Sequence, residues 1–187
     1  MNRMPAPTPS IFRSKGIGVG RLDRTGVFLD ETPILAPAGA EARTALLQRC
    51  VAADIPVAVT AVEHADIPDA ASLGPVSVAV LSGFSAADLA TGGDVERHLA
   101  EKAQLFLRAR GLRAAVLPAD DPGAELLAEV LPAGVRVLRF GTVESAAPLD
   151  LRATSITVGG GRTRVALTGT RLRRLERRGL GIRLRRL

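Results

Sequence analysis

The alternation of apolar and polar residues divides the middle of the chain into short strands and helices. Four short, nearly continuous apolar runs predict buried strands, and stretches of helical periodicity separate them. The predicted strands are 56–62, 76–82, 113–118 and 135–140. The predicted helices are 40–53, 94 to just before Gly111, and 122–131 with Pro122 in the first turn. This order is typical of a parallel sheet with helices on both faces.

The regions on either side of this core have different patterns. Residues 26–29 predict a short strand, with another near Ile34, and the glycines of GIGVG predict a turn. Residues 1 to about 15 are predicted to be disordered. The alternating segments LRATSITV and TRVALTGT, joined by GGGR, predict a β-hairpin. The predicted fold is α/β, a mostly parallel sheet flanked by helices with a C-terminal β-hairpin. The predicted limits are 1–16, 17–170 and 171–187.

Composition restricts the kind of core and the location of the protein. The chain is 47% hydrophobic but contains no Trp and no Tyr, so the core must consist mainly of Ala, Val and Leu. No apolar run reaches the roughly 18–20 residues of a membrane span, and the N-terminus has no signal-peptide pattern. We therefore expect a cytoplasmic protein without a transmembrane segment. Its single cysteine, Cys50, excludes an internal disulfide and favours a buried, inert thiol.

The positive charge is confined to the C-terminal tail. Residues 171–187 contain eight arginines and one glutamate, which leaves 17 basic and 18 acidic residues in the rest of the chain. Such a tail predicts nonspecific binding to an anionic membrane or nucleic acid. Two glycines interrupt any helix in it, and it lacks aromatic residues that stack on bases. The alternatives are a solvated end and a product of a shifted reading frame, which the coding DNA would test.

One lysine lies in an unexpected position. In the predicted helix, Val95, Leu99 and Phe106 define an apolar stripe, and Lys102 falls within it at 100° per residue. The ammonium can extend to water along its aliphatic stem, or it can pair with a carboxylate. It can also be functional, with a pKa lowered by burial. Periodicity alone leaves these three alternatives open.

The order of four segments resembles the central, ATP-binding domain of the Mur ligase family. That family has Glu-x-Ser-Ser-His after one strand and Asp-His-Leu-Asp after the next, then Tyr-x-x-x-Lys-x-x-Leu-Phe on a helix and Asn-x-Asp-Asp-Pro after a third strand. The corresponding segments in this chain are TAVEH (60–64), SGFSAADLATGG (82–93), HLAEKAQLF (98–106) and PADDP (118–122). The resemblance is greatest to the UDP-N-acetylmuramoyl-tripeptide synthetase type.

The resemblance implies a site for ATP and Mg²⁺. It implies that Lys102 is carbamylated and becomes an anionic Mg²⁺ ligand, with Asp88 as a second ligand. It implies that His64, Asp120 and Asp121 belong to the nucleotide site. Enzymes of this family phosphorylate a substrate carboxylate, and the amine of an amino acid then attacks the acyl phosphate. An inward-facing lysine is explained if it acts as a carboxylate-like ligand.

Several family features are absent from this chain. The phosphate-binding loop and the C-terminal domain are missing, and no G-x-x-x-x-G-K-[ST] sequence occurs. The family's metal-binding Glu, its two Asn and its two flanking Asp correspond to Thr60, Gly83, Pro118, Ala87 and Ala90. Asp120 and Asp121 can instead cap the helix that starts at Pro122, and His64 can be a loop residue.

The losses predict weak or absent catalysis by the chain alone. The predicted partners are a second copy or a protein that supplies the missing ligase parts, because an incomplete enzyme exposes apolar surface. The alternative prediction is a non-enzymatic interaction protein that binds anionic partners through its arginine-rich tail.

Overall fold

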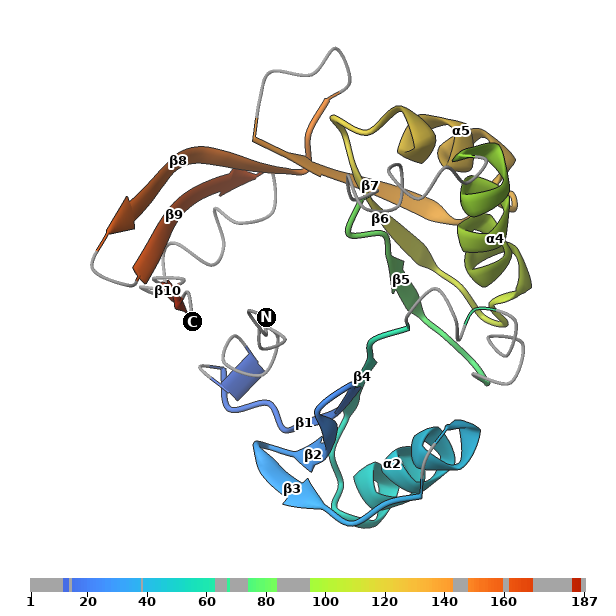
Figure 1. Ribbon diagram of the computed structural model, residues 1–187, viewed down its shortest axis with the longest axis vertical. Helices are drawn as coiled ribbons and strands as arrows, with labels where there is room; N and C mark the ends of the chain where they lie inside the picture. Colours follow the sequence, from blue (N-terminus) through green and yellow to red (C-terminus); the bar gives the residue numbers. More distant parts are fainter. Residues whose placement is uncertain are drawn as a thin grey trace. The chain divides into compact units, whose positions relative to one another are not determined.

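The chain forms two compact units, one of residues 1–63 with 184–187 and the other of residues 64–183. The computed structural model describes residues 12–13, 15–37, 39–62, 67, 74–83, 95–142, 148–159, 162–169 and 183–185 (Figure 1). His64, Asp88 and most of the arginine-rich tail lie outside these residues. The sequence predicts disorder for residues 1 to about 15; of these, Phe12, Arg13 and Lys15 are described, and the Lys15 N–H donates to the Phe12 oxygen in a turn, whereas the others lie outside the described residues. None of the described helices has the length and apolar content needed to cross a bilayer.

The first unit is a four-stranded mixed sheet with one helix packed on it. The strand order is β3-β2-β1-β4, in which β1 pairs antiparallel with β2 and parallel with β4. The elements are β1 (Val19–Asp23), β2 (Gly26–Leu29), β3 (Thr32–Ile34), α2 (Ala40–Ala52) and β4 (Val57–Thr60). Helix α2 buries Ala42, Leu46 and Cys50 against the sheet, where Val27 completes the cluster. The buried Cys50 thiol predicted from sequence is confirmed.

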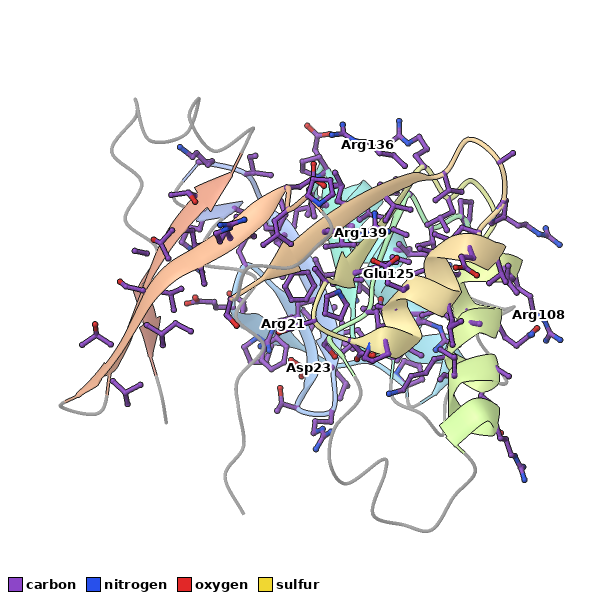
Figure 2. The ribbon with its side chains drawn as sticks, turned by 90° about the horizontal axis from the view of Figure 1, so that it is seen from above. Arg21, Asp23, Arg108, Glu125, Arg136 and Arg139 are labelled. Atoms are coloured by element: carbon purple, nitrogen blue, oxygen red, sulfur yellow. The ribbon has the colours of Figure 1, made fainter. Side chains whose placement is uncertain are left out.

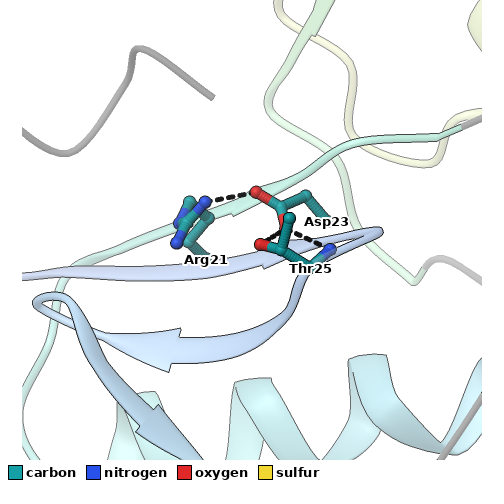
Figure 3. Close-up of polar contacts among 3 residues, drawn as sticks. All are labelled: Arg21, Asp23 and Thr25. Atoms are coloured by element: carbon teal, nitrogen blue, oxygen red, sulfur yellow. Dashed lines mark hydrogen bonds and ion pairs between the residues drawn. The ribbon is translucent and has the colours of Figure 1, made fainter. Parts of the chain in front are cut away.

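The turn between β1 and β2 is held by a carboxylate. Asp23 accepts hydrogen bonds from the backbone N–H and the hydroxyl of Thr25, and it forms an ion pair with Arg21 (Figure 3). The Arg21 guanidinium also lies 4.0 Å from the centre of the Phe28 ring. Burial alone would raise the pKa of Asp23, but the bonds from Thr25 and the charge of Arg21 lower it below its usual value.

The second sheet has the strand order β10-β9-β8-β7-β6-β5, and its strands β5 to β9 lie in the second unit. Strands β5 to β8 are mutually parallel, whereas β8 and β9 form an antiparallel hairpin. The strands are β5 (Val78–Val80), β6 (Ala114–Pro118), β7 (Arg136–Gly141), β8 (Leu151–Gly159), β9 (Arg162–Gly169) and β10 (Arg183–Arg185). The helices are α4 (Val95–Arg108) and α5 (Pro122–Val130).

Both described helices of this unit pack on the same face of the sheet (Figure 1). The core on this face combines small and large apolar side chains from β5, β6, α4 and α5, and its largest fully buried members are Phe106, Leu117 and Leu127. Val137 of β7 packs against this cluster. The sequence predicted helices on both faces of the parallel sheet, and the described helices occupy only one.

The opposite face of the sheet is apolar from β5 to β9, and we call it the open face. Residues paired across neighbouring strands point to the same side, so the strand register identifies its members. Its larger apolar members and alanines are Val78, Val80, Ala114, Val116, Leu138, Phe140, Leu151, Ala153, Ile156, Val158, Val165 and Leu167. The register also places Arg136, Thr163, Gly169 and the buried Pro118 on this face. Val78 and Val80 are 52% and 59% exposed, and Ile156 and Val158 are 53% and 54% exposed.

A β-bulge keeps the hairpin apolar on this face. Along β8, the apolar residues change phase between Ala153 and Ile156, so simple alternation would place them on opposite sides. The register shifts between Ala153 and Ser155, leaving Thr154 as the extra residue. The bulge therefore restores Ile156 and Val158 to the side that carries Leu151.

The elements predicted from sequence are largely confirmed, including the hairpin and the start of α5 at Pro122. The main error is at GIGVG, which was expected to be a turn. The turn covers only Lys15 and Gly16, and β1 begins at Val19. Gly20 lies within this strand. A Cβ at this position would be 2.2 Å from Sγ of Cys50, so the close packing of α2 on β1 requires a glycine here.

Candidate functional site

Lys102 lies in the middle of α4 and is turned toward the end of β5. Its side chain is half-buried, and its Nζ donates a long hydrogen bond of 3.4 Å to the backbone oxygen of Gly83. The stripe that contains Lys102 is the face that α4 packs on the sheet through Ala103 and Phe106. The structure thus agrees with the sequence that Lys102 lies on the sheet-facing side of its helix, and it adds that the lysine is near the carboxyl end of a parallel strand.

Gly83 supplies the backbone group that the lysine contacts. Its φ is +116°, a conformation that residues with a side chain rarely adopt. A Cβ at this position would lie 3.7 Å from Oδ2 of Asp121. The family resemblance identified Gly83 only as the position of a lost Asn. It did not indicate that the Gly83 carbonyl oxygen accepts a hydrogen bond from Lys102. A glycine directly after an apolar strand is the signal that could have indicated this role.

Asp121 is the N-cap of α5. Its Oδ1 accepts a hydrogen bond of 2.9 Å from the backbone N–H of Gly123, and Pro122 occupies the first turn. The carboxylate thus neutralises part of the positive end of the helix dipole. The capping role that the sequence offered as an alternative for Asp121 is confirmed, whereas the neighbouring Asp120 is exposed.

Three groups therefore meet at the carboxyl edge of the parallel strands: the Lys102 ammonium, the Gly83 carbonyl and the Asp121 carboxylate. They come from α4, from the end of β5 and from the start of α5, and Gly83 is near both side chains. In open α/β sheets, ligands bind at the carboxyl ends of the strands. An ammonium at this edge suits an anionic ligand such as a phosphate.

The predicted metal site is only partly within the described residues. Asp88 and His64 lie outside them, so their predicted roles stay predictions. Among the described residues, no group of three or more His, Cys, Asp or Glu side chains is placed to hold a metal ion. Within the described residues, Lys102 thus supplies a cation at this edge, and the described carboxylates do not by themselves provide a Mg²⁺ site.

An ion pair supports this edge from β7. Arg139 donates to both carboxylate oxygens of Glu125 on α5, at 3.1 and 2.9 Å, and the two side chains point toward each other in Figure 2. These hydrogen bonds lower the pKa of Glu125 and raise the pKa of Arg139. The backbone N–H of Arg139 also donates to Asp150. The contacts connect α5, whose N-cap is Asp121, to the sheet.

The fold is similar to that of ligases and a synthetase of known structure. The chain resembles a UDP-N-acetylmuramoyl-L-alanyl-D-glutamate–2,6-diaminopimelate ligase with a TM-score of 0.68 and 19% identity, over 87% of this chain and 34% of the ligase. It resembles folylpolyglutamate synthetase from Lactobacillus casei with a TM-score of 0.55 and 17% identity, over 87% of this chain and 45% of the synthetase. An FPGS–AMPPCP complex matches with a TM-score of 0.57 and 18% identity, over 87% of this chain and 46% of that protein.

Another solved structure has the same fold. MurF ligase from Thermotoga maritima in complex with ADP matches with a TM-score of 0.54 and 18% identity, over 87% of this chain and 34% of that ligase. The chain thus spans about a third to just under half of these proteins. No family model and no curated protein matches the sequence. These comparisons confirm the predicted α/β fold.

Proposed function

We propose that this chain is a nucleotide-binding module of the ATP-dependent ligase type that does not turn over ATP by itself. The observation that carries the proposal is the meeting of Lys102, Gly83 and Asp121 at the carboxyl edge of the parallel strands. The same fold occurs in a synthetase solved with AMPPCP and in a ligase solved with ADP.

Lys102 is the proposed phosphate contact. Its amine is anchored by the Gly83 oxygen, so little side-chain entropy is lost when a phosphate approaches. ATP, when bound, supplies the phosphoryl group that ligases of this type transfer to a carboxylate. In the carbamylated form, Lys102 would instead be an anion and would bind Mg²⁺ together with Asp88. Either form would explain why Lys102 lies in the sheet-facing stripe of α4.

Weak binding and no turnover are proposed because the usual phosphate cradle is missing. No phosphate-binding loop sequence occurs in the chain. At the start of α5, the Gly123 N–H already donates to Asp121. A partner that supplies the missing ligase parts would be needed for catalysis, and its substrate would be a carboxylic acid and an amine.

The test is titration calorimetry of Mg²⁺-ATP into the wild type and two lysine variants. We expect saturable binding by the wild type and at least tenfold weaker binding by Lys102→Met, since a hydrogen bond to a charged group contributes about 1.5–3 kcal/mol. Methionine retains the apolar stem in the helix stripe. Lys15→Met is the control, because Lys15 is the only other lysine of the chain.

Absence of saturable binding by the wild type would contradict the proposal. Equal weakening by the Lys15 and Lys102 substitutions would also contradict it, since the effect would then reflect only net charge. ATP hydrolysis by the chain alone, measured by phosphate release, would disprove the second part.

A further inference from the structure

The open face is apolar beyond what the unit's own core requires. The buried core of this unit comes from β5, β6, α4 and α5, all on the helical side of the sheet. The open face continues from β5 across to β9. Valine and isoleucine side chains that are more than half exposed lie on its edge strand β5 and on β8 of the hairpin. Parallel strands are normally covered on both faces, so this surface is typical of an interface.

The bulge at Thr154 is a second indication. If the open face were exposed to water, the hairpin would gain no stability from having all its apolar side chains on that face. The register shift at this residue nevertheless aligns Ile156 and Val158 with Leu151 and with the apolar row of β7. The hairpin thereby extends the open face beyond the strands that contact α4 and α5.

The face carries almost no charge. Among the described residues at its register positions, Arg136 is the charged one, and it is the first residue of β7. A surface of this kind does not attract nucleic acid or an acidic peptide. It suits another apolar sheet, and sheets pack face to face at a spacing of about 10 Å.

We infer that the open face binds the open face of a second copy of this chain, so that two sheets form a two-fold symmetric sandwich. A two-fold interface uses the same patch on both copies, and this patch is its own chemical complement. Strands β5 to β9 have three, five, six, nine and eight residues, so a rise of about 3.3 Å and a spacing of about 4.8 Å give a face of roughly 500 Å² in projection. Specific interfaces bury about 800 Å² per partner, so the dimer should be reversible and dissociate on dilution.

This inference does not depend on the proposed nucleotide site, and its test uses no nucleotide. Sedimentation equilibrium of the full chain over a wide concentration range should show a monomer–dimer equilibrium. Val80→Glu and Ile156→Glu should each weaken the dimer at least tenfold, because each would place a carboxylate in the apolar interface. Val130→Glu is the matched control: Val130 is 54% exposed on α5, and Val80 is 59% exposed on β5.

Three results would overturn the inference. One is a monomer at every concentration, which would mean that a different polypeptide or residues outside the described ranges cover the face. Another is a dimer that the Val130 substitution weakens as much as the Val80 substitution does. The third is indefinite aggregation with no dimer endpoint. If Val80→Glu fails to fold by circular dichroism, Ile156→Glu decides the question, since it lies in the hairpin, away from the core.

Discussion

Gly20 shows how one residue determines the position of a helix on a sheet. The sequence suggested a turn at this glycine because glycine is common in turns. In the structure it is a strand residue, and a Cβ would lie 2.2 Å from Sγ of Cys50 and 2.8 Å from Cδ1 of Leu46. The absent side chain thus allows α2 to approach β1. Nothing near Gly20 in the sequence indicates this contact, because its cause lies in a helix that follows later in the chain.

We predict that Gly20→Ala destabilises the chain by about 1–3 kcal/mol, the usual cost of overpacking a core. Urea denaturation would measure the loss. The double variant Gly20→Ala with Cys50→Ala should recover part of it, because the sulfur that meets the new methyl group is removed. A double variant no more stable than the sum of the two single losses would show that the sulfur is not the cause.

Lys102 shows what helical periodicity can and cannot predict about a site residue. The stripe of Val95, Leu99 and Phe106 placed the ammonium on the buried side of α4, and its hydrogen bond to Gly83 confirms that placement. Its partner could not be predicted, because a backbone oxygen has no signature in the sequence. Asp121 was easier to interpret, since an aspartate before a proline at a helix start is a common cap.

At the level of elements, apolar runs predicted the strands well but could not predict how far they are buried. Val78 and Val80 belong to a run that is typical of a strand covered on both faces, and yet each is more than half exposed. A continuous apolar run indicates that both faces of a strand carry apolar side chains. Whether a second layer is present depends on segments elsewhere, in this chain or in another.

The bulge of β8 leads to a prediction about deletions. Removing Thr154 leaves the order Leu-Arg-Ala-Ser-Ile-Thr-Val, in which the apolar residues alternate without interruption. We therefore expect the deletion to retain hydrogen-exchange protection in β9. Deleting Thr157 instead puts Ile156 and Val158 on opposite faces, which should cost about 1–2 kcal/mol of hairpin stability as cross-strand pairs are lost. Equal loss of protection in both deletions would contradict this account of the bulge.

At the level of the whole molecule, each unit has a separate apolar core. Leu46 is fully buried in the first unit, and Phe106 is 1% exposed in the second. The sequence predicted one domain over residues 17–170 and gave no sign of this division, because composition does not change near residue 63. Two cores allow the units to lose stability separately.

We predict that Leu46→Ala lowers the stability of α2, β1 and β2 by about 2–5 kcal/mol, and that Phe106→Ala lowers that of α4, β6 and α5 by about 3–5 kcal/mol. Hydrogen exchange followed by mass spectrometry would locate each effect. Each substitution should leave protection in the other unit close to that of the wild type. Loss of protection throughout both units from either substitution would show that they unfold together.

The cap of α5 has a consequence for any ligand at the carboxyl edge. Asp121 is itself an anion, and it already holds the backbone N–H that an incoming phosphate would use. At the proposed nucleotide site, the Asp121 carboxylate would therefore compete with a phosphate for this N–H. Such a cap contributes about 1 kcal/mol, so a phosphate that displaced it would bind about fivefold more weakly than at an uncapped helix. Replacing Asp121 by a residue without a carboxylate would lower the stability of α5 and raise the affinity for a phosphate at this helix end.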